Sequence, residues 1–268
     1  MAEPLSILEF GRQLLETGDL DPVYIVLYEA KLGADELERW LLAYWCFYHV
    51  GTASWITDQN EYWPAMLEAA GSKEYPRSAE RRHYRGTFAV KSVRWLEEQG
   101  LEALLSPLTE SGPLTVERVV GIVKSWYGFG SWIAFKVADM LERLGLADIT
   151  FDEKSVLLYD SPRKGAEELY AARFGGRGDP CQAPAYALRL LTRQSGGLGA
   201  LLAPPRYERV INVQEVETTL CKYHSYRHGH YHVGEDLEAV RHGLLRFPNS
   251  TTADRLLQAG RKVELWDT

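Results

Sequence analysis

The 268-residue sequence is poor in cysteine and lacks any long apolar run. Its three cysteines, Cys46, Cys181 and Cys221, form no pairing pattern. A disulfide framework is therefore excluded and a reducing compartment is expected. No apolar stretch approaches the roughly 18 residues that span a membrane, and the N-terminus lacks the basic flank and apolar core of a signal peptide. We expect a soluble, cytoplasmic protein with no membrane partner.

An excess of positive charge is also missing, because the formal net charge is −7. Proteins that coat DNA non-specifically neutralise many phosphates with lysine and arginine, so this class is excluded. A local basic cluster remains compatible with phosphate binding. Such a cluster occurs within 18 residues and contains Arg77, Arg81, Arg82, Arg85, Lys91 and Arg94.

Fixed-period repeats and low-complexity tracts are absent, and strand patterns are few. Apolar residues instead recur at helical spacing almost throughout, which predicts a mainly α protein. With 46% apolar residues the chain can bury a sizeable core. We treat residues 1–268 as one domain, and the sequence is also compatible with two helical lobes within it. The predicted helices are Ser6–Glu16, Val23–Leu32, Asp35–His49, Glu61–Ala70, Glu80–Gln99, Val116–Tyr127, Trp132–Leu144, Pro184–Thr192, Val213–Lys222 and Ala253–Ala259.

One of these segments is apolar on nearly all sides. Ala34–Val50 has an acidic first turn followed by an almost continuous apolar run, which is typical of a buried central helix. Gly51 comes directly after it, and glycine is common just past the end of a helix. We therefore expect the central helix to end at this glycine.

A Gly-x-Gly turn, Gly128 and Gly130, opens the helix predicted near Trp132. Glycine permits a tight turn with positive φ. The N–H groups of Gly130, Ser131 and Trp132 lie at a helix start, where they lack intrahelical partners and face any anion ahead of them. DNA phosphate is the natural candidate. The alternative is an ordinary connection between two helices.

This turn resembles the helix-hairpin-helix element of the base-excision DNA glycosylase superfamily, in which Gly-x-Gly-x-x-x-Ala precedes a short extended run and an aspartate. Here these residues are Gly128, Gly130, Ala134 and Asp152. The resemblance implies a mainly α, helix-hairpin-helix DNA glycosylase-like fold in which Asp152 faces an extruded nucleotide. Trp132 occupies the position of the nucleophilic lysine of bifunctional glycosylases, so lyase chemistry is not expected there.

Two further segments are similar to those of the bacteriophage amino acid:DNA transferases, also called α-glutamyl/putrescinyl thymine pyrophosphorylases. They are Tyr75–Gly86 and Glu217–Lys222, the latter with the trailing residues Gly229–Tyr231 and Val233–Asp236. The resemblance extends from about Val23 to Leu245. It implies a phage enzyme that works in the cytoplasm of the infected bacterial host, acts on 5-pyrophosphoryloxymethyl-uracil in double-stranded phage DNA and displaces pyrophosphate with an amine or amino acid. We predict glycine as the donor, while putrescine, glutamate and serine stay open.

The arginine cluster offers ligands for the pyrophosphate, because guanidinium matches phosphate geometry. The predicted ligands are Arg77, Arg81, Arg82, Arg85 and His83. Arg81 and Arg85 are expected one turn apart on the helix that starts at Glu80, with Arg82 beside them. Arg81 and Arg82 are expected to be exposed. The alternative is a solvated basic surface.

Asp152 is the predicted catalytic base, because the attacking amine must lose a proton. It also precedes Glu153, Lys154 and Ser155 in a position suited to a helix N-cap. The two roles are compatible with one another.

The segment Asn212–Lys222 adds further candidates on one predicted helix. Glu217 and Cys221 share a face and are catalytic candidates, Cys221 as a thiolate that adds to uracil C6. A buried structural cysteine is the alternative. Lys222, His224 and His230 are predicted to contact substrate phosphate.

Cys221 and the histidines at 224, 228, 230 and 232 also raise the question of zinc. The paired spacing typical of structural zinc sites is missing, so we predict no metal site. Mg²⁺ would assist only with the pyrophosphate, and no organic cofactor is required. Two rival functions remain open: a monofunctional DNA glycosylase that uses Asp152, and a non-enzymatic helix-hairpin-helix binding module.

Overall fold

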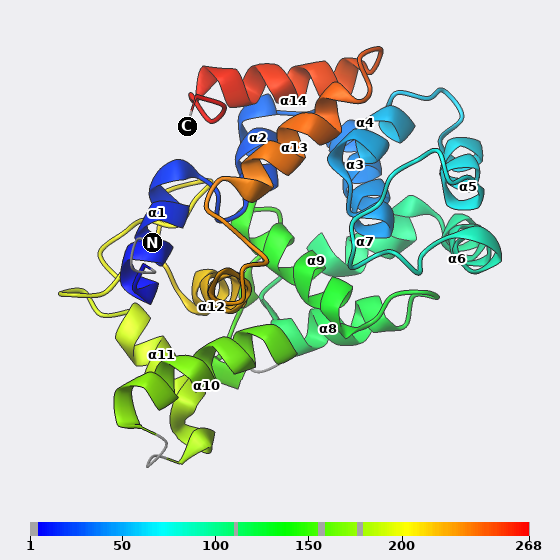
Figure 1. Ribbon diagram of the computed structural model, residues 1–268. Coiled ribbons are helices and arrows are strands. Elements are labelled where there is room, and N and C mark those ends of the chain that lie inside the picture. The colour runs from blue at the N-terminus through cyan, green and yellow to red at the C-terminus, as the bar shows by residue number, and fades with distance from the viewer. Residues whose placement is uncertain (1–4, 110–111, 155–158, 176–178, 268) are drawn as a thin grey trace. The chain divides into compact units, whose positions relative to one another are not determined.

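The computed structural model describes residues 5–109, 112–154, 159–175 and 179–267. Helices make up nearly all of the regular structure in these ranges (Figure 1), so the predicted mainly α class is confirmed. The chain divides into two compact units, one formed by Met1–Pro22, Thr150–Leu237 and Thr268 and the other by Val23–Ile149 and Glu238–Asp267. None of the described helices has the length and apolar character to cross a membrane.

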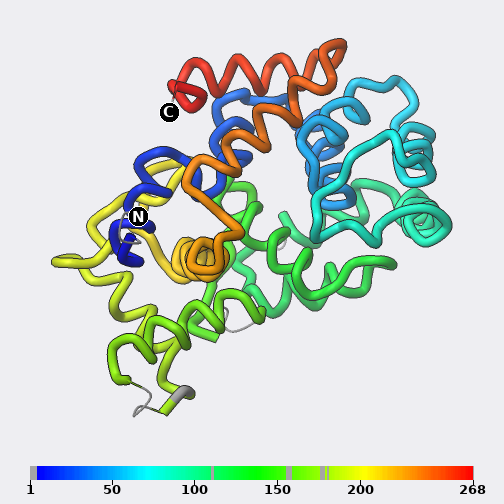
Figure 2. Tube along the Cα trace, in the orientation of Figure 1, coloured from blue at the N-terminus to red at the C-terminus, as the bar shows by residue number. Residues whose placement is uncertain are grey.

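The first unit is built around α12, which packs against α10 and α1 (Figure 2). Its apolar core includes the fully buried side chains of Phe10, Leu14 and Leu220. Its helices are α1 (Ile7–Thr17), α10 (Asp160–Phe174), the 3-10 turn η2 (Pro180–Gln182), α11 (Ala183–Leu191) and α12 (Val213–Arg227).

Local capping fixes where α12 begins. The Asn212 side chain accepts the N–H of Gln214, and the Glu215 carboxylate accepts the N–H of Asn212 at 2.8 Å. These reciprocal bonds satisfy donors that a helix start leaves unpaired. Glu215 is fully buried and also pairs with Arg209 at 3.0 Å. The helix therefore starts at Val213, as predicted.

The second unit holds the remaining elements. Its helices are α2 (Pro22–Ala30), α3 (Ala34–Phe47), α4 (Val50–Thr57), α5 (Tyr62–Gly71), α6 (Gly86–Gln99), α7 (Leu101–Thr109), α8 (Val116–Lys124), α9 (Ser131–Arg143), α13 (Glu235–Leu245) and α14 (Thr251–Lys262), where α2 and α13 start in the first unit. Two short strands, β1 (Leu114–Thr115) and β2 (Ile149–Thr150), pair with one another.

Helix α3 is the predicted central helix, and every residue from Trp40 to Phe47 is buried. The helix does not end at Gly51. Tyr48 adopts the left-handed conformation (φ 50°) that ends it, and α4 starts at once. Gly51 lies inside α4, where a Cβ atom would be 2.0 Å from the carbonyl oxygen of Gly243. Close approach to α13 therefore explains this glycine.

The helix predicted from Glu80 is the clearest error in the secondary structure. Residues 78–84 form successive turns, in which Arg81 N–H donates to Ser78 O and Tyr84 N–H donates to Arg81 O. Helix α6 begins only at Gly86, whose φ of 60° reverses the chain. Four helices were not predicted: α4, α7, α10 and α13.

Candidate functional site

The predicted hairpin is present as α8, a turn and α9. Gly128 has φ of 89°, and a Cβ atom there would lie 2.7 Å from Ser92 Oγ. Glycine is thus required at 128 by conformation and by space. Gly130 has φ of −96°, so the expected positive φ is wrong for this residue. A Cβ atom at Gly130 would meet nothing within 4 Å.

The start of α9 is exposed. Gly130 and Ser131 are exposed, and no side chain caps the helix at Gly130. Trp132 is half-buried, with its ring 4.8 Å from that of Tyr48. The first residues of a helix lie at the positive end of the helix dipole, and their N–H groups lack intrahelical partners. The geometry is compatible with a bound phosphate, and DNA binding by this turn stays a prediction.

Arg81 is buried, contrary to the expectation of an exposed arginine. Only 7% of the residue is accessible, its Nε donates to Cys46 O at 2.8 Å, and Nη1 donates to Gly128 O at 3.3 Å. Its guanidinium also lies over the rings of Tyr84 and Phe129. Because Nε and Nη1 donate to backbone carbonyls of α3 and the hairpin, Arg81 joins these segments, and we infer that it positions the hairpin.

Arg77 has a similar structural role. Its guanidinium donates to the backbone carbonyls of Ala69, Ser72, Tyr75 and Tyr84. Four carbonyl acceptors on one arginine fix the path of the loop between α5 and α6. Arg77 is therefore committed largely to the fold.

The other three members of the predicted phosphate-binding group are exposed. Arg82, His83 and Arg85 all lie on the surface, and Arg82 donates to Ala79 O at 3.0 Å. Arg85 is the residue that directly precedes α6. These three side chains remain the candidates for contact with pyrophosphate in this loop.

Asp152 is exposed and follows β2. Its carboxylate accepts the backbone N–H of Lys154 at 3.0 Å, which is the capping contact proposed as the alternative role. One carboxylate can accept several hydrogen bonds. The contact with Lys154 is therefore compatible with a second role as proton acceptor, which stays a prediction.

The candidates on α12 differ in exposure. Glu217 and Lys222 are buried, Cys221 is half-buried, and Glu217 accepts a hydrogen bond from Thr218 Oγ1 at 3.3 Å. Lys222 Nζ donates to Asp19 O and to Tyr231 Oη, and lies 2.6 Å from Asp236 Oδ2. Lys222 is thus held in a network of its own unit. The catalytic roles of Glu217 and Cys221 stay predictions.

Asp19 organises the same network and was not singled out from the sequence. Its buried carboxylate accepts the Tyr231 hydroxyl and the N–H groups of Gly234 and Leu237. Burial, followed by the nearby carboxylates of Asp236 and Asp19, raises the pKa of the Tyr231 hydroxyl, which therefore remains a donor. Asp19 fixes the chain that leads into α13.

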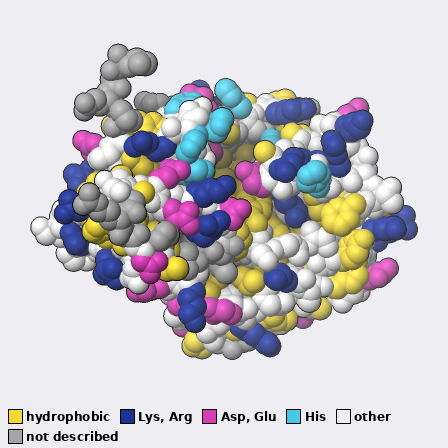
Figure 3. All heavy atoms as spheres, turned by 60° about the horizontal axis from the view of Figure 1, so that its bottom comes forward, with side chains coloured by type: hydrophobic (Ala, Val, Ile, Leu, Met, Phe, Trp, Pro, Cys, Tyr) yellow, Lys and Arg dark blue, Asp and Glu magenta, His cyan; other side chains and the backbone are white. Residues whose placement is uncertain are grey.

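His224 and His230, both predicted to contact phosphate, are in different surroundings. His230 is exposed, whereas His224 Nδ1 lies 2.8 Å from Glu168 Oε1. His228 Nε2 is 3.9 Å from the same carboxylate oxygen. Figure 3 shows histidine side chains grouped on one face of the molecule. Glu168 was not predicted because α10 was not predicted, although two histidines four residues apart on one helix face signal a shared partner.

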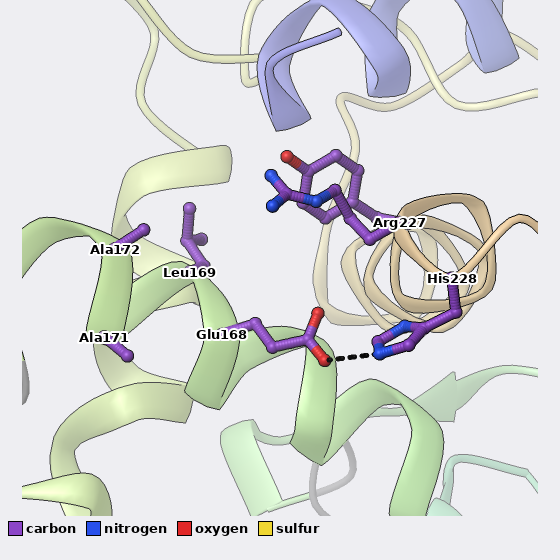
Figure 4. Close-up of a pocket in the computed structure, with 7 residues that line it drawn as sticks. Glu168, Leu169, Ala171, Ala172, Arg227 and His228 are labelled. Carbon is purple, nitrogen blue, oxygen red and sulfur yellow. Dashed lines mark ion pairs between the residues drawn. The ribbon is translucent and has the colours of Figure 1, made fainter. Parts of the chain in front are cut away.

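A pocket of about 400 Å³ lies between α10 and α12. Glu168 of α10 and His228, the residue directly after α12, point toward one another at this pocket, and Arg227 contributes another charged side chain (Figure 4). Tyr223, Leu169, Ala171 and Ala172 complete the lining. This pocket lies wholly within the first unit. It therefore combines a carboxylate, a cation and an apolar wall.

Comparison with known proteins gives a consistent result. Residues 15–232 match the family model described as "Amino acid:DNA transferase". A glycinyltransferase of Pseudomonas phage PaMx11 is 34% identical, over 97% of this chain and 98% of its own length. A putrescinyltransferase of Delftia phage PhiW-14 is 27% identical, over 95% of this chain and 82% of its own. The chain therefore belongs to the amino acid:DNA transferase family, enzymes that modify DNA.

Proposed function

We propose that this transferase uses glycine to displace pyrophosphate from 5-pyrophosphoryloxymethyl-uracil in double-stranded phage DNA. The observation that carries the choice of glycine is the end-to-end similarity to a protein named glycinyltransferase, which exceeds the similarity to the putrescinyltransferase. The modified thymine is extruded from the duplex, because the substituted group on C5 must reach a catalytic pocket.

In the proposed reaction the glycine nitrogen attacks the C5 methylene carbon. The carbon–oxygen bond to pyrophosphate breaks, and pyrophosphate leaves with the bonding electrons. The nitrogen gives up a proton to Asp152, whose exposed position supports this role. Each of these steps conserves atoms and charge without an oxidant or reductant.

Charge on the leaving pyrophosphate is stabilised by Arg82, His83 and Arg85, whose exposure supports the assignment. The exposed start of α9 at Gly130 and Ser131 holds a phosphate of the DNA backbone. Removing one positioned donor from such a site costs about 2.7–4 kcal/mol in the transition state.

Nucleoside mass spectrometry tests the proposal. DNA that carries 5-pyrophosphoryloxymethyl-uracil is incubated with the protein and, in separate reactions, with glycine, putrescine, glutamate or serine. The expected product is a glycine adduct that forms faster than any other. A preference for putrescine would overturn the choice of donor, and abasic sites without an adduct would instead favour a DNA glycosylase.

A further inference from the structure

Glu168, His224 and His228 form a compact group to which the steps proposed above assign no role. Each offers one donor atom, and these three atoms lie within 4.8 Å of one another. Glu168 comes from α10, His224 lies in the last turn of α12, and His228 is the C-cap residue directly after that helix. Because α10 and α12 pack closely together, the three side chains converge from two rigid elements.

Second-sphere contacts orient one of the histidines. His228 Nδ1 lies 2.8 Å from the backbone carbonyl oxygen of His224. A carbonyl oxygen only accepts, so Nδ1 carries the proton. Nε2 of the neutral ring then carries a lone pair, and this nitrogen lies 3.9 Å from Glu168 Oε1. Metal-ligating histidines characteristically donate their second ring N–H to a carbonyl or carboxylate in this way.

Two acceptors that face one another require a positive charge between them. A second proton, on His228 Nε2, would supply one positive charge, and a divalent metal ion would supply two. Ligands bound tetrahedrally at about 2.0–2.2 Å stand roughly 3.3 Å apart. The observed donor separations of 2.8 Å (Glu168–His224) and 3.9 Å (Glu168–His228) bracket this value. Small rotamer changes in surface side chains would therefore close the site around an ion.

We infer that Glu168, His224 and His228 bind a divalent transition-metal ion of the Zn²⁺ class. Two imidazoles and one carboxylate suit zinc or its neighbours, whereas Mg²⁺ prefers oxygen ligands and water. Two of the three ligands line the 400 Å³ pocket, so the open coordination positions face it. The ion would take the place of the hydrogen bond between Glu168 Oε1 and His224 Nδ1, which lie 2.8 Å apart.

Arg227 is the nearest other cation at this pocket. The Tyr223 hydroxyl binds its guanidinium and raises the pKa, with a further contribution from the Glu168 carboxylate, so it stays charged. The side chain is exposed, and solvent screens its repulsion of a bound ion. This cation also favours an anionic ligand, such as phosphate, in the open coordination positions.

The test uses tag-free, full-length protein freed of metal by chelator dialysis, with Co²⁺ as an optical probe and Zn²⁺ as its competitor. We expect one Co²⁺ per chain, displaced by Zn²⁺. Glu168→Gln and His228→Gln should each weaken binding at least about 10-fold, because even losing an outer-shell partner costs 10–100-fold. His228 is exposed and Glu168 is half-buried, so circular dichroism should show folded variants.

His232→Gln is the matched control. His232 pairs with Glu235 at 3.1 Å, which is a histidine–carboxylate pair outside the group of three. This variant should bind Co²⁺ as the wild type does. Equal Co²⁺ affinity in wild type and His228→Gln, or no stoichiometric binding by the wild type, would overturn the inference and leave a hydrogen-bonded ion pair. The measurement needs no DNA, so it is independent of the transfer reaction.

Discussion

The Arg77–Arg85 loop and the α12 segment both contain charged residues predicted to hold substrate, yet the hydrogen-bond partners of these residues differ. In the loop, Arg77 and Arg81 donate to backbone carbonyls. On α12, Lys222 pairs with the carboxylate of Asp236 and with Tyr231. Carbonyl acceptors are fixed parts of the fold, whereas carboxylates are side chains that another cation can also engage.

The loop also separates adjacent residues. Arg81 is buried and Arg82 is exposed, although they are neighbours in sequence. A cluster of like residues therefore does not behave as one surface. We expect substitutions at exposed positions to affect the reaction, and substitutions at buried positions to affect stability. The predictions below test this division.

The largest effect is expected at the exposed Asp152. If it accepts the proton of the amine, Asp152→Asn should lower the transfer rate by roughly 10²–10⁴. Asparagine caps about as well as aspartate, so the contact with Lys154 and the melting temperature should persist. Rates measured across a pH series should show partial rescue at high pH, where more amine is already deprotonated. An unchanged rate would leave Asp152 as a cap only.

Arg81→Ala should destabilise the protein by about 3 kcal/mol, because two charge-assisted hydrogen bonds from a buried group are lost. Arg82→Ala is the matched variant, with a stability change within about 0.5 kcal/mol and a transfer rate reduced by roughly 10²–10³. Urea unfolding and single-turnover transfer measure the two effects. Equal stability of both variants would break the comparison between buried and exposed arginines.

The two glycines of the hairpin form a second pair. Gly128→Ala should cost about 1–3 kcal/mol, since it places a side chain at φ of 89° and against Ser92. Gly130→Ala has open space and ordinary φ, so stability should hold. DNA affinity, measured by fluorescence anisotropy, should nevertheless fall, because the methyl group obstructs a phosphate. Unchanged affinity at 130 would make the hairpin a simple turn.

A smaller, pH-dependent effect is expected at His49, which precedes α4. Burial, and then the charge of Arg246, lowers the pKa of His49 from its ordinary 6.5 to about 4. Between these values the unfolded state binds the extra proton, so stability falls as pH drops from about 6.5 to 4, by at most about 3 kcal/mol. His49→Gln should flatten this part of the unfolding profile. An unchanged slope would place the pH dependence elsewhere.

Helical periodicity predicted the fold class and the buried α3, because apolar spacing reports directly on the face that packs inward. It did not predict α4, since α3 ends at a non-glycine residue, Tyr48, and the next helix follows without a loop. Helix α10 carries few buried residues, namely Pro162, Gly165 and Ala166, so its periodicity is weak.

The candidate site was predictable in residue type but not in environment. Sequence spacing placed basic residues near Arg81. The burial of the Arg81 side chain, however, depends on contacts with Gly128 and Cys46, which are distant in sequence. Glu168 meets His224 across 56 positions, a tertiary contact that no local pattern contains.

The central claim is an amine-for-pyrophosphate exchange on DNA, and one reaction tests it directly. The protein is incubated with [¹⁵N]glycine and DNA carrying 5-pyrophosphoryloxymethyl-uracil, and label in the DNA and free pyrophosphate are measured together. The account predicts equal molar amounts of both, with neither formed when glycine is omitted. Pyrophosphate release without incorporated label, or loss of the base without either, would contradict it.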